Sequence, residues 1–162
     1  MRPHTRRYAV DMHEHANTEF TLRPARLDDI NGIFHVRTSV RENALSLDAL
    51  AALGITPASI AQRLQGAPCA WVACDGPAIV GFSMVDLDEG ALFAAFVLPS
   101  HEGRGIGKAL VAPAERALFA RHPVAWLETA RASRAEGFYR RLGWGDATDI
   151  GGGDIRLEKP RP

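Results

Sequence analysis

A glycine-rich turn between an apolar stretch and a helical pattern constrains this chain more than any other part of its sequence. The turn reads Glu102-Gly-Arg-Gly-Ile-Gly-Lys108 and follows the apolar residues 91–98. Glycine allows positive φ angles and a close approach of the backbone to a ligand. Free N–H groups at the start of the next helix point to one spot, where the helix dipole also attracts an anion. We therefore predict a diphosphate site, with positive charge from Arg104 and Lys108.

Two common phosphate-binding motifs do not fit this turn. A P-loop ending at Lys108 needs glycine at 102 and serine or threonine at 109, where the chain has Glu102 and Ala109. A dinucleotide fingerprint needs glycine at 108 or 110, where the chain has Lys108 and Leu110. A nucleotide-phosphate binder is therefore the less favoured interpretation. A plain tight turn without a ligand is the structural alternative.

Apolar periodicity predicts an α+β domain over residues 18–162, preceded by an arm, residues 1–17, that we expect to be flexible. The expected helices are 28–40, 47–64 in two pieces, 105–120 and 134–142, and the expected strands are 20–23, 69–74, 79–87, 91–98 and 124–127, with one or two edge strands in 146–159. The order favours a mixed, mostly antiparallel sheet flanked by helices. Because residues 91–98 are apolar without alternation, we expect a central strand covered on both faces.

Composition excludes several classes of protein. The 162 residues include 19 Lys+Arg and 19 Asp+Glu, so no basic excess indicates nucleic-acid binding. No apolar run approaches the ~20 residues of a membrane helix, and the start of the chain is not typical of a signal peptide. We therefore expect a cytoplasmic protein. Cys69 and Cys74 lack metal-ligand spacing and are interpreted as reduced, apolar strand residues.

Two segments together resemble the GNAT superfamily of N-acetyltransferases. Residues 102–110 resemble its acyl-CoA loop, [QR]-x-x-G-x-[GA], with Gly105 and Gly107 matching and Glu102 in the place of Gln or Arg. Residues 135–144 resemble the family ending A-x-x-F-Y-x-x-x-G-F, with Trp144 in the place of the last Phe. The two motifs occur in the family's order, one helix and one strand apart.

The resemblance implies a fold and a binding site. The fold would be a mixed, mostly antiparallel sheet in which two strands splay apart to form an acyl-CoA cleft. Acetyl-CoA would be the co-substrate, without a metal. The residues implied for its binding lie on the strand before the turn and in the turn itself: Phe96, Val97, Leu98, Gly103, Arg104, Gly105, Ile106, Gly107 and Lys108.

The resemblance also implies a reaction. A primary amine, on a small molecule or a protein, would attack acetyl-CoA directly in a ternary complex. Tyr139 matches the tyrosine that gives a proton to the leaving sulfur. The general base is left open, with Glu128 and Glu42 ranked ahead of Asp86 and Glu89, and Glu42 and Asn43 are expected in the acceptor pocket.

Two further points stay open at the level of the sequence. A non-catalytic acyl-CoA-binding or sensor module on the same fold is the alternative function. The sequence is also compatible with a homodimer.

Overall fold

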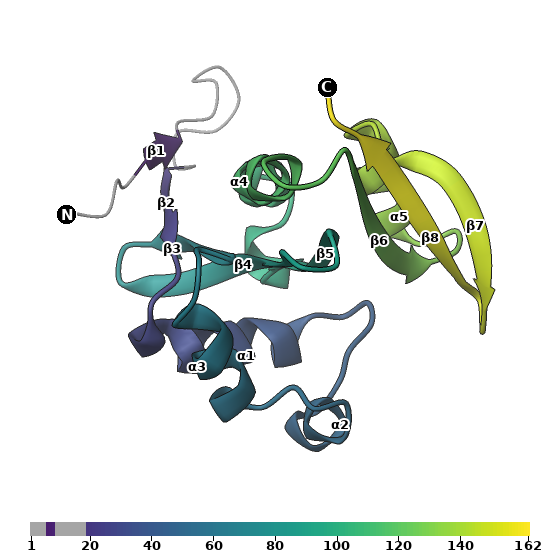
Figure 1. Ribbon diagram of the computed structural model, residues 1–162. Helices are drawn as coiled ribbons and strands as arrows, with labels where there is room; N and C mark the ends of the chain where they lie inside the picture. Colours follow the sequence, from purple (N-terminus) through teal and green to yellow (C-terminus); the bar gives the residue numbers. More distant parts are fainter. Residues whose placement is uncertain (1–5, 9–18) are drawn as a thin grey trace.

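An eight-stranded mixed sheet runs through the computed structural model, which describes residues 6–8 and 19–162 (Figure 1). The strand order is β1-β2-β3-β4-β5-β6-β8-β7, and β5 with β6 is the parallel pair among antiparallel neighbours. The strands are β1 Arg6–Tyr8, β2 Phe20–Pro24, β3 Ala70–Asp75, β4 Ala78–Asp86, β5 Ala91–Val97, β6 Val124–Ala130, β7 Gly145–Gly151 and β8 Asp154–Pro160. The helices are α1 Ile30–Ser39, α2 Leu47–Ala52, α3 Pro57–Leu64, α4 Ile106–Phe119 and α5 Arg134–Arg141, with short 3-10 turns at Leu27–Asp29 and Pro99–His101.

The predicted α+β class and the predicted order of elements from residue 20 onward are confirmed. The helical region 47–64 forms two helices as expected, because Thr56 caps α3: its Oγ1 accepts the N–H of Ser59 at 3.1 Å, and Pro57 takes the first helical position. Cys69 and Cys74 are buried free thiols, and burial raises the pKa of each.

The C-terminal segment was expected to supply one or two edge strands. It supplies one, because β7 is at the edge of the sheet and β8 lies between β6 and β7. Ile155 and Leu157 of β8 are buried in the core. β5 was expected to be covered on both faces, and core residues lie on each side of it. Phe93 is the exception, 43% exposed at the bulge opposite Met84 and Val85.

Most of the predicted N-terminal arm lies outside the described residues. Within it, β1 pairs antiparallel with β2, from Arg6 opposite Leu22 to Tyr8 opposite Phe20. Flexibility of the arm stays a prediction.

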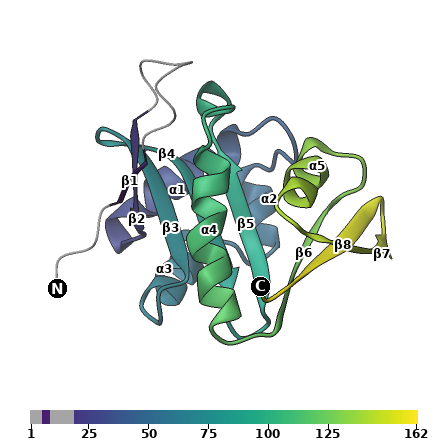
Figure 2. The same cartoon turned by 90° about the horizontal axis from the view of Figure 1, so that it is seen from above.

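Helices cover the two faces of the sheet in separate layers. α4 lies over β3, β4 and β5 on one face, with α5 beside β6 (Figure 2). α1, α2 and α3 cover the opposite face (Figure 1). Gly81 lets α4 approach β4 closely, because a Cβ there would lie 3.0 Å from Leu110 Cδ1. The two cores therefore meet across β3, β4 and β5. No helix in the described part of the chain is long and apolar enough to cross a membrane.

A buried ion pair ties β2 to the start of α1. Arg23 contacts Asp29 through two hydrogen bonds, Nη1 to Oδ2 at 2.6 Å and Nη2 to Oδ1 at 2.8 Å. The backbone N–H of Arg26 donates to the same carboxylate at 2.7 Å. Burial raises the pKa of Asp29, but the bonds from Arg23 and Arg26 outweigh it, so the pKa is lowered overall. Asp29 is therefore mainly the partner of Arg23.

We predict that Asp29→Asn destabilises the protein by about 3 kcal/mol at neutral pH, because it leaves a largely buried guanidinium without its counter-charge. A lowered folded-state pKa gives stability above the unfolded pKa of about 3.9, and this stability is lost as the pH falls through the folded value. The difference between wild type and variant should therefore shrink in acid. Urea unfolding at several pH values measures it. Asp28→Asn, at an exposed neighbouring position, is the matched control, and equal effects of the two changes would contradict the prediction.

Candidate active site

β5 and β6 share one backbone bridge and then diverge. The bridge joins Ala91, the first residue of β5, to Trp126 of β6. The N–H of Trp126 donates to the carbonyl of Gly90 at 3.1 Å, and its indole Nε1 donates to the carbonyl of Glu89 at 2.9 Å. The two strands thus form a V that is closed at Trp126 and open at their C-terminal ends. The splayed strand pair expected from the resemblance is confirmed.

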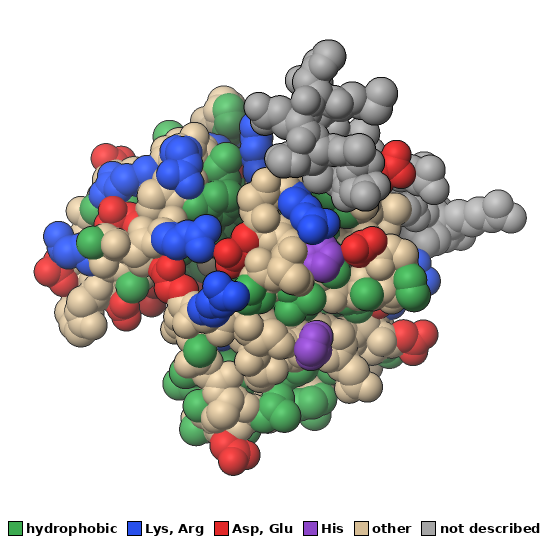
Figure 3. Space-filling model, turned by 180° about the vertical axis from the view of Figure 1, so that it is seen from behind, with side chains coloured by type: hydrophobic (Ala, Val, Ile, Leu, Met, Phe, Trp, Pro, Cys, Tyr) green, Lys and Arg blue, Asp and Glu red, His purple; other side chains and the backbone are tan. Residues whose placement is uncertain are grey.

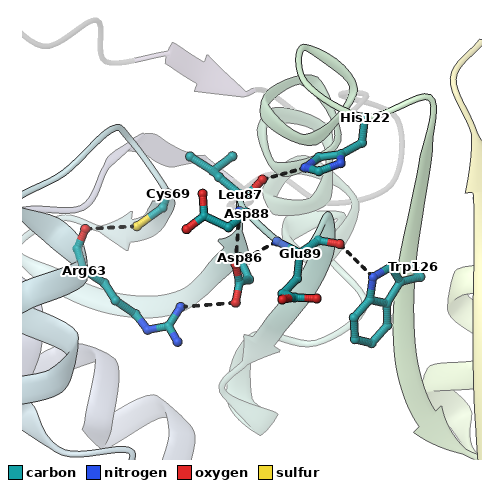
Figure 4. A network of polar contacts seen from close by, with 8 residues as sticks. All are labelled: Arg63, Cys69, Asp86, Leu87, Asp88, Glu89, His122 and Trp126. Carbon is teal, nitrogen blue, oxygen red and sulfur yellow. Dashed lines mark hydrogen bonds and ion pairs between the residues drawn. The ribbon is translucent and has the colours of Figure 1, made fainter.

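A polar network holds the closed end of the V (Figure 4). Asp86 Oδ1 accepts the N–H groups of Asp88 and Glu89, each at 3.1 Å, and Asp86 Oδ2 lies 3.9 Å from Arg63 of α3. The ring Nε2 of His122 donates to the carbonyl of Leu87 at 2.6 Å. Asp86 and Glu89, two of the candidate bases, therefore belong to a turn that fixes the vertex.

The glycine turn lies at the open end of the V, after Pro99. Gly103 and Gly105 have φ angles of 74° and 79°, which other residues rarely adopt. Gly105 is the N-cap of α4, and no side-chain hydrogen bond caps it. The first backbone bond of the helix runs from Ala109 to Gly105 at 3.1 Å. The N–H groups of Ile106, Gly107 and Lys108 consequently have no partner within the helix, as an anion site requires.

The free edge of β5 faces the opening of the V. The N–H of Leu98 donates to the carbonyl of Val80 at 2.8 Å, and Phe96 pairs with Phe82 of β4. Because backbone groups alternate along an antiparallel ladder, those of Phe96 and Leu98 point to β4, and those of Ala95 and Val97 point into the opening. Of the strand residues expected to bind the cofactor through the backbone, Val97 points into the opening. Ala95, which was not among them, points the same way.

Tyr139 lies on α5 between two other aromatic rings. Its ring centroid is 5.1 Å from that of Phe138 and 6.2 Å from that of Trp144, and the residue is 8% exposed. Burial raises the pKa of the phenol, so Tyr139 carries its proton at neutral pH. Phe138 packs on Gly107, where a Cβ would lie 3.3 Å from its ring. Gly107 therefore brings α5 close to the start of α4.

Two further contacts fix α5 against the rest of the site. Glu115 of α4 accepts the indole N–H of Trp144 and the ammonium of Lys159, each at 3.0 Å. Glu102, which departs from the family pattern, forms an exposed ion pair with Arg134 at 3.2 Å. The pair joins the glycine turn to the first residue of α5, a contact that the sequence pattern did not indicate.

The remaining candidate residues lie apart from the glycine turn. Glu128 is on β6, with its side chain 49% exposed and 3.4 Å from Arg156. Glu42 is exposed in the loop after α1, and the carbonyl of Asn43 accepts a hydrogen bond from Arg37 at 3.0 Å. An apolar pocket borders this loop, on the face of the sheet opposite α4, and its lining includes Arg37 and Phe96. The sequence did not predict that Arg37 lines this pocket, because a basic residue in the last turn of a helix gives no sign of a pocket.

Figure 3 shows a hollow with hydrophobic side chains between two lobes of one face, bordered by Lys and Arg side chains. A helix that begins at a glycine lies beside an opened pair of strands, and the class of this molecule is a mixed α/β fold. The sequence profile of the acetyltransferase (GNAT) family matches residues 38–144, more than half of the chain. The chain therefore belongs to that family, as the resemblance of its two motifs implied.

Solved structures of similar fold agree with this assignment. The PaiA N-acetyltransferase of Thermoplasma acidophilum, in complex with coenzyme A, is 16% identical with a TM-score of 0.71, over 88% of this chain and 99% of that one. The ribosomal-protein-S18-alanine N-acetyltransferase of Escherichia coli is 22% identical with a TM-score of 0.65, over 87% and 93%. The yncA protein of Salmonella typhimurium, with its cofactor acetyl-CoA, is 17% identical with a TM-score of 0.63, over 87% and 93%. A comparison with curated protein sequences found no significant match.

The raised pKa of Tyr139 can be tested directly. In Tyr8→Phe, Tyr139 is the one tyrosine left, because the chain has two. We predict that its ionisation, followed by phenolate absorbance, occurs above the ordinary value of about 10. The same titration of the protein unfolded in denaturant is the control and should return the ordinary value. A folded-state midpoint at or below about pH 10 would contradict the prediction.

Proposed function

We propose that this protein transfers an acetyl group from acetyl-CoA to a primary amine by direct attack in a ternary complex. One observation carries the proposal: β5 and β6 part at the place where the uncapped, glycine-rich start of α4 presents free N–H groups. Membership of the acetyltransferase (GNAT) family supports it.

The open end of the V fits coenzyme A in two ways. The N–H groups from Gly103 to Lys108 hold the diphosphate, and the helix dipole with Arg104 and Lys108 adds attraction. A Cβ at Gly103 would meet nothing within 4 Å, so the outer side of the turn is open. The pantetheine arm lies along the free edge of β5 and pairs with Ala95 and Val97 like an added strand. The thioester is then held between β5 and β6.

The reaction makes one bond and breaks another. The lone pair of the neutral amine attacks the acetyl carbonyl carbon, the C–N bond forms, and the C–S bond breaks. A backbone N–H of β5 stabilises the negative charge that develops on the carbonyl oxygen. Tyr139 gives its proton to the departing sulfur, a step for which the phenol must be protonated, as its burial ensures.

Glu128 is the base we propose for the amine proton, which it receives through water. Its place on β6, two residues beyond the vertex at Trp126, puts it on the strand that flanks the V. Its half-exposed carboxylate is open to water on one side and paired with Arg156 on the other.

We predict that Gly105→Val weakens the binding of coenzyme A at least about tenfold, because a branched side chain disfavours the positive φ and blocks the backbone from the diphosphate. Calorimetric titration with coenzyme A measures the loss. Gly54→Val is the matched control, since Gly54 has the same φ of 79° and lies after α2, away from the turn. Equal affinities of the two variants for coenzyme A would count against the turn as the diphosphate site.

We predict that Tyr139→Phe lowers kcat about 100-fold and leaves the KM for acetyl-CoA nearly unchanged, because it removes a proton donor and keeps the packed ring. Steady-state release of free thiol, with an amine that the wild type accepts, measures both constants. An unchanged kcat would remove Tyr139 from the acid role. A wild type that binds acetyl-CoA but acetylates no amine would instead indicate the non-catalytic acyl-CoA module.

A further inference from the structure

Residues of α1, α2, α3, β4 and β5 line an apolar pocket. Figure 1 shows that these helices cover the face of the sheet opposite α4. The cavity volume is about 70 Å³, room for a small apolar group, and the pocket is partly open to solvent. Four phenylalanine rings and several aliphatic side chains form its walls: Ile33, Phe34, Leu50, Ile55, Ile60, Phe82, Met84, Phe93, Ala94 and Phe96, with Arg37 as the one charged member.

Arg37 brings a positive charge to this pocket. Its guanidinium carbon lies 4.3 Å from the centre of the Phe96 ring, and its Nη1 donates to the carbonyl of Asn43 at 3.0 Å. No acidic side chain among the described residues forms an ion pair with it, in contrast to Arg23 with Asp29. Burial without a counter-charge lowers the pKa of Arg37, although a guanidinium stays charged at neutral pH. Its remaining N–H groups suit a carboxylate, which a planar fork binds with two hydrogen bonds.

The one charged residue of the pocket lining is positive. The lining contains no Asp, Glu or His. Beyond it, Arg63 lies 5.5 Å from the centre of the Phe93 ring and pairs weakly with Asp86 at 3.9 Å. Like charges lower the pKa of a nearby amine and so favour the neutral form that attacks. The same charges disfavour acceptors with several ammonium groups, such as polyamines.

β5 is the wall that this pocket shares with the V. Ala94 and Phe96 face the pocket, and the backbone of Ala95 and Val97 faces the opening where the thioester would lie. An acceptor seated on the phenylalanine rings therefore has its amine beside the free edge of β5.

Resting on the proposed function, we infer that the acceptor is a free α-amino acid with an aromatic or branched apolar side chain, whose carboxylate is bound by Arg37. The side chain occupies the apolar pocket and the α-amine points to β5. The amine nitrogen forms a bond to the acetyl carbon as the C–S bond breaks. The proton that the nitrogen loses is balanced by the one that the sulfur gains, so the products are an N-acetyl amino acid and free coenzyme A.

The test compares two amines that share a ring and differ in the carboxylate, L-phenylalanine and phenethylamine, with acetyl-CoA as the donor. We expect the wild type to prefer L-phenylalanine in kcat/KM. In Arg37→Gln, the ratio of the two kcat/KM values should fall about 10- to 100-fold, the usual effect of losing a hydrogen-bonded charge pair. Arg37→Lys should restore part of the ratio, since it keeps the charge and loses the fork.

The matched control is Arg121→Gln, which removes an exposed guanidinium just after α4 that is not part of the pocket lining. The ratio should stay within about threefold of the wild-type value in this variant. An equal fall of the ratio in both variants would overturn a specific role of Arg37 in carboxylate binding.

A binding measurement separates this inference from the proposed function. L-phenylalanine should raise the thermal stability of the wild type and not that of Arg37→Gln, whether or not turnover occurs. Arg37-dependent binding without acetylation of any amine would support the pocket assignment and overturn the proposed activity. Acetylation of phenethylamine, spermidine or a peptide N-terminus in preference to L-phenylalanine would overturn the inference and leave the activity standing. Neither binding nor turnover would overturn both.

Discussion

The site of this protein depends on one interrupted strand pairing. A parallel pair within a sheet normally satisfies the backbone groups of both strands along their length. β5 and β6 do so at Ala91 and Trp126 and then separate, so backbone donors and acceptors of β5 are left for another partner. The separation persists because the turn before β5 is tied to Trp126, His122 and Arg63, while α4 and α5 keep the far ends apart. An acyl-CoA arm is the extended, amide-containing chain that such an edge would pair with.

β5 presents its edge and some of its side chains to different regions. Its free edge faces the opening of the V, and the side chains of Ala94 and Phe96 face a pocket under α1, α2 and α3. A bulge opposite Met84 and Val85 turns Phe93 outward. In the direct transfer that we propose, the two substrates would approach this one strand from different directions.

Polar contacts within a largely apolar core hold the segment after β6, which comprises α5, β7 and β8. The carboxylate of Glu115 on α4 accepts hydrogen bonds from the indole of Trp144 and the ammonium of Lys159. Lys159 also donates to the carbonyl of Leu142 at 2.7 Å. These bonds connect α4, the end of α5 and β8. They set the position of Tyr139, because Trp144 packs against its ring. Glu115, which lies outside both motifs, thus helps to orient the side chain that we propose as the proton donor to the leaving sulfur.

The sequence alone predicts the features that depend on neighbouring residues, such as turns and helix ends. The glycines of the turn, the cap at Thr56 and Gly143 after α5, with φ of 95°, act within a few residues, so the local pattern is enough to predict the ends of these helices. The diphosphate site in the turn stays a prediction. Tertiary structure alone decided the features that join distant segments: the place of β8 inside the sheet, the pair of Arg23 with Asp29, and Arg37 over Phe96. The physical reason is that burial and ion pairing depend on which surfaces meet, and no local pattern carries that information.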